Sequence, residues 1–267
     1  MRVDPESGKM EPMATGLRSP AGIESSPDGE IFYTDNQGEW CNASKLSHLS
    51  HGEFHGHPHG LPTIEQAGEP FSKIPSPKSG TYMKDLHETI PQFKMPAVWF
   101  PYNKTGRSPA GMAWDTTKGA FGPFAGPLFV TDHYDASIVR VCLEEVAGNW
   151  QGACIPFRMG FQCGTIRCDF GPDGSLLVGM TNRGWGGRGN SPYGLQRLRW
   201  TGETRPSGCS TTRSTDRAPA KARTAAAPVS PEVAVRIVSR SPEAARASSV
   251  SAATSCMARS LNAAVGP

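Results

Sequence analysis

The sequence places five of its seven histidines between His48 and His59, in the stretch HLSHGEFHGHPHG. Imidazole nitrogens are good ligands for zinc and copper. In an extended segment, His57 and His59 would face the same side, and a pair of imidazoles arranged in this way can hold such an ion. A second interpretation stays open, in which the stretch is a surface loop that senses pH.

Several familiar catalytic patterns are absent from the sequence. It has no phosphate-binding P-loop, no dinucleotide fingerprint and no G-x-S-x-G nucleophile motif. Asp132, His133 and Ser137 are too close along the chain to suggest a catalytic triad, whose members usually come from distant positions. The sequence also has no run of about 18 apolar residues, so we expect no membrane span.

Composition divides the chain near residue 202. All Trp, Tyr and Phe lie at or before Trp200, and residues 203–267 are rich in Ala, Ser, Arg and Pro. This tail lacks the apolar surface that offsets the entropy of folding, so we expect it to be disordered, either as a natural linker or as a frameshift product. It also carries most of the net positive charge. Residues 1–202 are slightly acidic and show no basic patch among aromatics, which makes nucleic acid a poor candidate partner.

Residues 1–202 contain a phrase that recurs. GLRSPAG begins at Gly16, GRSPAG begins at Gly106, and the strand-like runs GEIFYTD, GPLFVTD, SIVRVCL and GSLLVGM occur between turn residues. The tripeptide PDG, at Pro27 and again at Pro172, predicts a tight turn before a strand. The spacing of the phrases is close to multiples of roughly 40 to 50 residues, which is typical of the blades of a β-propeller.

Four motifs in residues 2–202 together resemble the glucose/sorbosone dehydrogenases, six-bladed propellers that bind pyrroloquinoline quinone. GLRSPAG resembles the family's GxRNPQG, and HGEFHGHP resembles its kGxNYGWP. MPAVWFPYNKTGRSPAG and FGPFAGPLFVTD resemble two later family segments, in the same order. The resemblance predicts an all-β fold over residues 1–202, an incomplete six-bladed β-propeller of about three to four blades, followed by the disordered tail. The central strands would lie at 31–34, 128–131 and 176–179.

The resemblance also implies a cofactor site. The Arg and Asn that hold the quinone in the family map onto Arg18 and Ser19, and Arg107 occupies the same place in the second copy of the phrase. A further cofactor-binding Arg of the family maps near Arg167. Guanidinium groups bind carboxylates through paired hydrogen bonds, which suits a cofactor that is a tricarboxylate. A structural role, in which Arg18 and Arg107 brace the blade through backbone carbonyls, stays open.

Calcium lies beside the cofactor in the family, in a loop matched here by DNQGE. The resemblance therefore places a calcium site at Asp35, Gly38 and Glu39, whose oxygens suit this cation. The same match puts His55 and His57 where the family has aromatic residues, which favours packing over metal binding. The family's catalytic His maps before Met1, so no catalytic residue is assigned.

Two functions remain open at this point. The chain is part of a quinone-dependent dehydrogenase that oxidises a small-molecule sugar or alcohol and passes electrons to a cytochrome-type acceptor, or it is a non-catalytic propeller segment that binds carbohydrate or a partner protein. The family implies a periplasmic or extracellular protein. In that oxidising setting Cys163 and Cys168 could form one disulfide and Cys142 and Cys154 another, or these residues could remain buried thiols.

Overall fold

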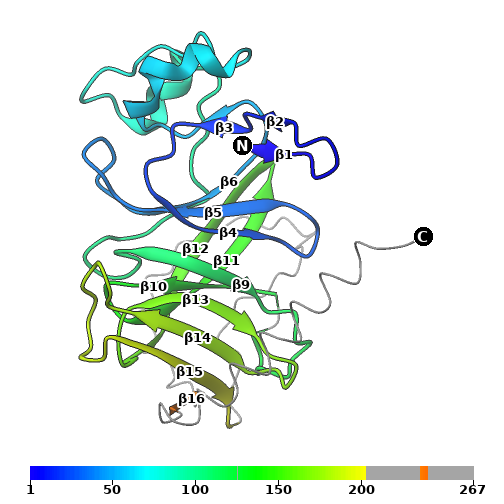
Figure 1. Ribbon diagram of the computed structural model, residues 1–267, viewed down its shortest axis with the longest axis vertical. Coiled ribbons are helices and arrows are strands. Elements are labelled where there is room, and N and C mark those ends of the chain that lie inside the picture. The colour runs from blue at the N-terminus through cyan, green and yellow to red at the C-terminus, as the bar shows by residue number, and fades with distance from the viewer. Residues whose placement is uncertain (125, 203–234, 240–267) are drawn as a thin grey trace, which may run out of the picture.

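The computed structural model describes residues 1–124, 126–202 and 235–239, and this part of the chain consists mostly of strands, with few helices. Three antiparallel sheets of four strands follow one another along the molecule (Figure 1). The first sheet contains, in order, β4, β5, β6 and β8, with bounds Pro20–Ser25, Ile31–Asp35, Lys45–His48 and Val98–Trp99. The second contains β9, β10, β11 and β12, with bounds Pro109–Trp114, Leu128–Asp132, Ser137–Val146 and Asn149–Met159. The third contains β13, β14, β15 and β16, with bounds Thr165–Phe170, Leu176–Thr181, Tyr193–Trp200 and Val235–Ser239.

Smaller elements lie beside the first sheet. β1 and β2 form an antiparallel pair, and β3 pairs in parallel with β7; their bounds are Arg2–Val3, Met10–Glu11, Ala14–Thr15 and Glu53–Phe54. Two 3-10 helices, η1 and η2, occupy Pro58–Ala67 and Met83–Glu88 and appear in cyan in Figure 1. The sequence patterns do not predict these helices. They pack over a small core of their own, which includes Phe54, Leu61 and Leu86.

The strands that the sequence predicts as central are confirmed. β5, β10 and β14 cover the ranges 31–34, 128–131 and 176–179, and each is the second strand of its sheet. The two predicted PDG turns also form. Gly29 and Gly174 have φ values of 91° and 72°, which glycine adopts without steric cost, and each turn leads directly into one of these strands.

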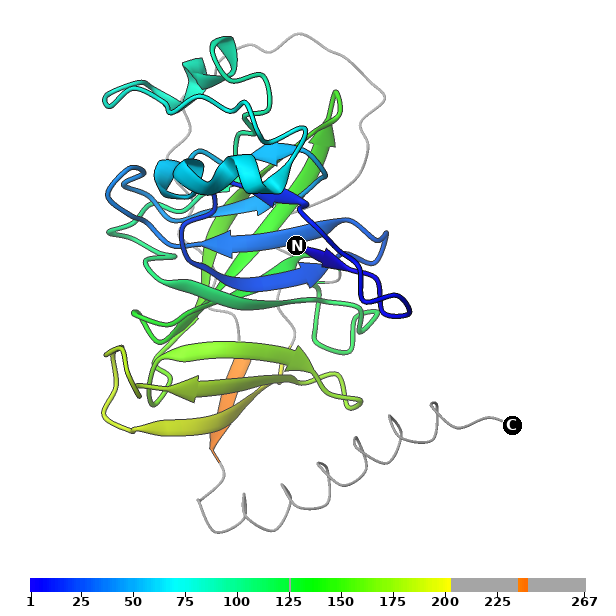
Figure 2. The ribbon, with the colours of Figure 1, turned by 45° about the horizontal axis from the view of Figure 1, so that its top comes forward.

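The first strands of the three sheets lie side by side, with β9 between β4 and β13 (Figure 2). Glycines of the repeated phrase allow this approach. A Cβ atom on Gly22 would lie 2.0 Å from the carbonyl oxygen of Ala110, and one on Gly111 would lie 2.8 Å from that of Ile166. The glycine in RSPAG therefore recurs because the backbone of the next sheet passes directly over it.

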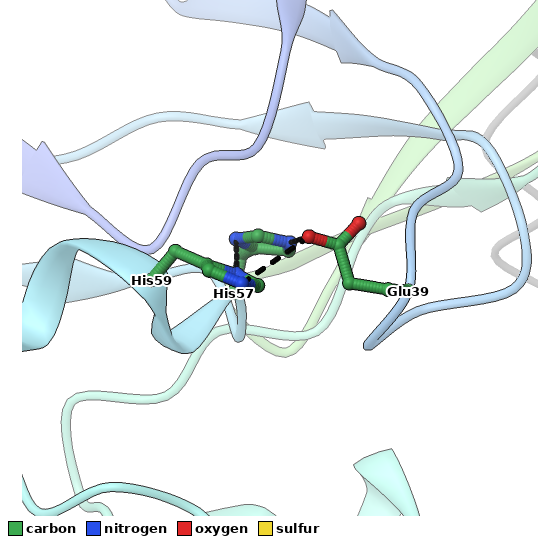
Figure 3. Close-up of side chains that lie close together, drawn as sticks. All are labelled: Glu39, His57 and His59. Carbon is green, nitrogen blue, oxygen red and sulfur yellow. Dashed lines mark hydrogen bonds and ion pairs between the residues drawn. The ribbon is translucent and has the colours of Figure 1, made fainter.

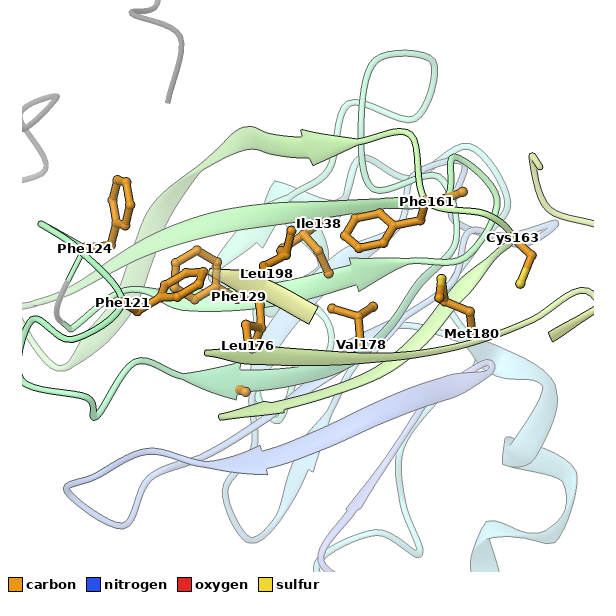
Figure 4. Close-up of a cluster of buried hydrophobic side chains, with 12 residues drawn as sticks. Phe121, Phe124, Phe129, Ile138, Phe161, Cys163, Leu176, Val178, Met180 and Leu198 are labelled. Atoms are coloured by element: carbon orange, nitrogen blue, oxygen red, sulfur yellow. The ribbon is translucent and has the colours of Figure 1, made fainter. Parts of the chain in front are cut away.

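Two apolar clusters hold the sheets together. The cluster between the first and second sheets includes Phe32, Leu46, Leu128 and Val139. The cluster between the second and third sheets is shown in Figure 4 and is formed mainly by Phe121, Phe124, Phe129, Ile138, Phe161, Leu176, Val178, Met180 and Leu198. Each sheet thus buries its apolar side chains against its neighbour, which is the main source of stability for such a stack.

Strand β16 lies within the region that the sequence analysis assigns to the tail. Its backbone pairs antiparallel with β15 over five residues, so the expectation of disorder is wrong for Val235–Ser239. The run VRIVS is rich in β-branched residues, which favour strands, and the outer edge of β15 offers unpaired backbone groups. The rest of the predicted tail, 203–234 and 240–267, lies outside the described residues.

Neither of the disulfides that the sequence allows is formed, because Cys154, Cys163 and Cys168 are free thiols. Cys154 stands opposite Val141 in the register, so Cys142 next to it points to the other face of the sheet. Cys163 and Cys168 are five residues apart along a mostly extended segment, or roughly 16 Å, which is too far for a disulfide. Burial raises the pKa of the Cys168 thiol.

The described residues include no helix with the length and apolar character needed to cross a bilayer.

Candidate functional site

Asp35, at the end of β5, fixes the loop that carries the first copy of the phrase. Its carboxylate accepts hydrogen bonds from the backbone amides of Arg18 at 3.0 Å and Ser19 at 2.7 Å. The ammonium of Lys45, opposite Asp35 on β6, lies 3.2 Å from the same carboxylate, and both side chains are almost completely buried. The paired charges and the two amides together hold the Arg18 loop in one conformation.

Asp132, at the end of β10, does the same for the second copy. Its carboxylate accepts hydrogen bonds from the backbone amides of Arg107 at 3.1 Å and Ser108 at 3.0 Å. The residue opposite Asp132 on β11 is Ser137, which is neutral. Burial raises the pKa of Asp132, because the ionised carboxylate loses its water. The Asp of the repeated run TD thus fixes the backbone of the Arg-Ser loop in both sheets, a role that the sequence alone does not predict.

These two loops bring their arginines to the same pocket. It has a volume of about 380 Å³ and is lined by Arg18, Ser19, Asn36, Gln37, Tyr102, Arg107, Ser108, Tyr134 and Trp185. Three of the four residues predicted to bind the cofactor therefore meet here, although they come from two sheets. The fourth, Arg167, does not line the pocket.

Arg107 is held between two aromatic rings of the pocket. Its guanidinium carbon lies 3.8 Å from the ring centre of Tyr134 and 5.1 Å from that of Tyr102. The contact with Tyr102 is the main cause that raises the pKa of Arg107. Stacking of this kind orients the guanidinium so that its remaining N–H groups can reach an anionic partner.

Arg18 crosses the loop between β5 and β6. A Cβ atom on Gly38 would lie 2.7 Å from Nε of Arg18, so the absence of a side chain at Gly38 makes room for the guanidinium. Nε of Arg18 also lies 3.8 Å from the Glu39 carboxylate, in an ion pair whose members are both well exposed. Such a pair contributes little to stability, so Arg18 can turn toward a ligand at small cost.

Arg167 has a different environment. Its guanidinium donates hydrogen bonds to the carbonyl oxygens of Ala21, at 2.8 Å, and Ile166, at 2.9 Å. It thereby connects β13 to β4. This is the bracing of backbone carbonyls that was one of the two possible roles of Arg18 and Arg107. Those two arginines instead line the pocket.

The calcium site that the resemblance implies at Asp35, Gly38 and Glu39 stays a prediction, with the backbone oxygens of Gly38 and Glu39 as its donors. The Asp35 carboxylate binds two backbone amides and the ammonium of Lys45. The Glu39 side chain lies near the imidazole nitrogens of His57 and His59.

The histidine stretch divides into two environments. His55 is buried edge-on against Tyr33, with ring centres 5.1 Å apart, and burial lowers its pKa to about 3, so it packs as a neutral ring. His57 and His59 stack on each other, with ring centres 4.6 Å apart, and both face Glu39 (Figure 3). They lie on the same side as predicted, but the segment is not extended throughout, because η1 begins at Pro58.

The aromatic residues of the pocket are not among the residues predicted from the sequence to bind the cofactor. Tyr102 lies four residues before the second copy of the phrase, and Tyr134 lies two residues after the Asp that anchors it. Trp185 follows β14, at the corresponding end of the third sheet, and is largely exposed. The signal available in the sequence was a Trp shortly after the strand-like run GSLLVGM.

No protein-family model matches the chain, and no curated protein matches it. Among solved structures, the chain is similar to an oxidoreductase described as a glucose dehydrogenase from Thermus thermophilus, with 21% identity and a TM-score of 0.45 over 70% of this chain and 45% of that one. It is also similar to the PQQ-bound aldose sugar dehydrogenase from Streptomyces coelicolor, with 14% identity and a TM-score of 0.46 over 73% and 47% of the two chains. The chain spans less than half the length of these proteins.

Proposed function

We propose that the chain is part of a quinone-dependent sugar or alcohol dehydrogenase-like propeller, and that the pocket between Arg18 and Arg107 binds pyrroloquinoline quinone. The observation that carries this proposal is the convergence of two repeated arginines and three aromatic side chains on one pocket. A flat tricarboxylate requires both kinds of group, because guanidinium groups bind carboxylates and aromatic faces pack against a planar ring.

Several of the lining residues then have a defined task. Arg18 and Arg107 bind carboxylates of the cofactor, and the aspartate cap behind each arginine fixes its backbone. Tyr134 and Trp185 supply apolar faces, while the side-chain amides of Asn36 and Gln37 supply hydrogen bonds. The bound quinone supplies the capacity to accept two electrons from an alcohol. The protein's contribution is to bind and orient it.

The proposal extends to the propeller that the three sheets would belong to, and to its substrate, electron acceptor and location. The three four-stranded sheets, with their first strands side by side, would be three blades of a six-bladed propeller whose axis runs past β4, β9 and β13. The substrate would be a small sugar or alcohol and the electron acceptor a cytochrome-type protein. The expected location is the periplasm or the cell exterior.

One feature of the pocket favours the alternative of carbohydrate binding without catalysis. Trp185 is 71% exposed, and it lies with two tyrosines and amide side chains in an open pocket. Exposed aromatic faces next to hydrogen-bonding amides are also suitable for a neutral sugar. Under this alternative, the arginines would contribute less to affinity, because an uncharged ligand can accept their hydrogen bonds but cannot form an ion pair with them.

A fluorescence titration of the full chain separates the two functions. Pyrroloquinoline quinone in the pocket should quench the emission of Trp185, and Trp185→Phe should remove that part of the quenching. Arg18→Ala should weaken binding of the quinone, whereas Arg197→Ala should not, because Arg197 pairs with Asp173 away from the pocket. Binding of glucose with equal affinity by wild type and Arg18→Ala, without any binding of the quinone, would favour the carbohydrate-binding alternative.

A further inference from the structure

The loop after β5 and the start of η1 bring three metal-ligating side chains together. One ligand atom from each of Glu39, His57 and His59 lies within 4.8 Å of the others. Oε1 of Glu39 is 3.3 Å from Nε2 of His59 and 3.8 Å from Nε2 of His57. Figure 3 shows both imidazoles directed at the same carboxylate oxygen.

These separations are close to those in an occupied zinc site. Zinc binds imidazole nitrogen and carboxylate oxygen at about 2.0 to 2.2 Å, so two ligands of one tetrahedral ion lie roughly 3.3 Å apart. The His59 to Glu39 distance already has this value, and the His57 to Glu39 distance exceeds it by 0.5 Å. A small rotation of the exposed side chains of Glu39 and His59 would complete the set.

His57 provides an independent indication of a ligand. Its side chain is only 5% exposed, and its Nε2 atom is buried without a hydrogen-bond partner among the described residues. A buried polar atom left in this state costs free energy. The atom faces Glu39 at 3.8 Å, which is too long for a hydrogen bond but leaves space for an ion between the two groups.

The backbone around the three side chains is well fixed. The amide of His57 donates to the carbonyl of Gly16 at 2.9 Å, and Pro58 immediately begins η1, which sets the position of His59. On the opposite side, the amide of Gly38 donates to the carbonyl of Cys41 at 2.8 Å and closes the loop that carries Glu39. The ligands therefore come from two segments that are held in place before any ion binds.

We propose that Glu39, His57 and His59 bind a zinc ion. Two imidazole nitrogens and one carboxylate oxygen suit a borderline cation such as zinc better than calcium, which prefers oxygen alone. Three protein ligands leave a fourth tetrahedral position for water. The site lies outside the arginine pocket and requires neither the quinone nor its substrate.

Zinc binding would change the protonated nitrogens of His57 and His59 and would break the hydrogen bond between the two rings. Nδ1 of His57 lies 3.3 Å from Nδ1 of His59, so one of these atoms donates to the other when no ion is bound. Coordination through both Nε2 atoms places a proton on both Nδ1 atoms, and the exposed ring of His59 must then turn its Nδ1–H toward water. Oε2 of Glu39, the oxygen nearer Arg18, remains able to pair with that arginine.

The test is a zinc titration of the full chain after removal of metal by a chelator, read by competition with a chromophoric zinc indicator. Wild type should bind one zinc ion at this site, and Glu39→Gln and His59→Ala should each weaken its binding by roughly tenfold or more. Both side chains are largely exposed, so neither substitution should disturb the fold. His87→Ala, at an exposed histidine on η2, is the matched control and should bind zinc like wild type.

Cobalt in place of zinc distinguishes this site from the cysteines of the chain. The first equivalent should give visible absorption bands of a four- or five-coordinate ion with nitrogen and oxygen ligands, without a sulfur-to-cobalt charge-transfer band. Zinc affinity unchanged in both Glu39→Gln and His59→Ala would overturn the proposal. So would a sulfur-to-cobalt band at the first equivalent, or a loss of affinity in His87→Ala as large as that in His59→Ala.

Discussion

The first and second sheets hold the arginine loop in the same way, through a buried aspartate, but the charge of that aspartate is balanced differently in the two sheets. In both, an aspartate at the end of the second strand accepts the backbone amides of the Arg-Ser dipeptide. In the first sheet the residue opposite that aspartate is Lys45, and the two side chains form a buried ion pair. In the second sheet the residue opposite Asp132 is Ser137.

The difference separates two roles of the aspartate, namely fixing the backbone of the Arg-Ser loop and pairing with a charge on the neighbouring strand. The carboxylate caps the loop in both sheets, so the backbone before β4 and β9 follows the same course. The residue opposite the aspartate on the third strand differs. In the first sheet it is Lys45, whose ammonium lies beside the Asp35 carboxylate. In the second sheet it is the neutral Ser137, and burial raises the pKa of Asp132. A third version exists after β14, where Asn182 accepts the amide of Gly164 at 2.9 Å through a neutral side chain.

The largest expected effect is that of Asp35→Asn. It leaves the ammonium of Lys45, which is only 2% exposed, without its counterion. We expect the free energy of unfolding in urea to fall by about 3 to 5 kcal/mol, the range for breaking one side of a buried ion pair. Asp132→Asn is the matched control and should lower it by only about 1 to 2 kcal/mol, since a neutral amide still accepts one of the two backbone N–H groups but leaves the other without its acceptor.

A double variant sharpens the same comparison. Lys45→Met combined with Asp35→Asn removes the unpaired charge, so it should recover most of the stability that Asp35→Asn alone loses. If the double variant is as unstable as Asp35→Asn, the loss comes from the amide cap and not from Lys45. Equal losses in Asp35→Asn and Asp132→Asn would lead to the same conclusion.

A smaller effect is expected at the glycines of the repeated phrase. Gly22→Ala places a Cβ atom 2.0 Å from a carbonyl oxygen of β9, and Gly111→Ala places one 2.8 Å from a carbonyl oxygen of β13. We expect a loss of about 1 to 3 kcal/mol in the free energy of unfolding, larger for Gly22→Ala, because backbone must move. Gly179→Ala, whose Cβ atom would have ordinary contacts at 3.8 Å, should change stability by less than about 1 kcal/mol. Losses of equal size in all three variants would argue against the close strand contacts.

The smallest effect concerns pH. The pKa of Asp132 is raised in the folded protein, so its protonated form is favoured by folding. Its contribution to stability is complete below the unfolded pKa of about 3.9 and is lost as the pH rises through the folded pKa. Wild type should therefore gain stability relative to Asp132→Asn when urea unfolding is repeated at pH 4 instead of pH 7. A difference between the two proteins that does not change with pH would contradict the raised pKa.

Local signals in the sequence predicted much of the fold. The runs GEIFYTD, GPLFVTD and GSLLVGM each contain three consecutive apolar or aromatic residues, and two of them, GEIFYTD and GSLLVGM, follow a PDG turn whose glycine has a positive φ. β5, β10 and β14 could therefore be located from neighbouring residues alone. The helices η1 and η2 could not, because their short sequences lack the periodicity and caps of longer helices. β16 could not either, since it depends on the free edge of β15.

The candidate site was only partly predictable. Motif matching assigned Arg18, Ser19 and Arg107, and the structure brings all three to one pocket. It also assigned Arg167, which binds backbone carbonyls elsewhere. The contact of Glu39 with the two histidines joins loops about 20 residues apart, and no local pattern encodes it. Contacts of this type depend on the packing of whole sheets.

The central claim is that two copies of one phrase place two arginines on a single anionic ligand. Calorimetric titration of pyrroloquinoline quinone into wild type, Arg18→Ala, Arg107→Ala and the double variant tests it most directly. Each single substitution should reduce the binding free energy by about 1.5 to 3 kcal/mol, the range for a hydrogen bond to a charged group, and the double variant should bind more weakly than either. If wild type does not bind the quinone, or if both single variants bind it as tightly as wild type, the account is contradicted.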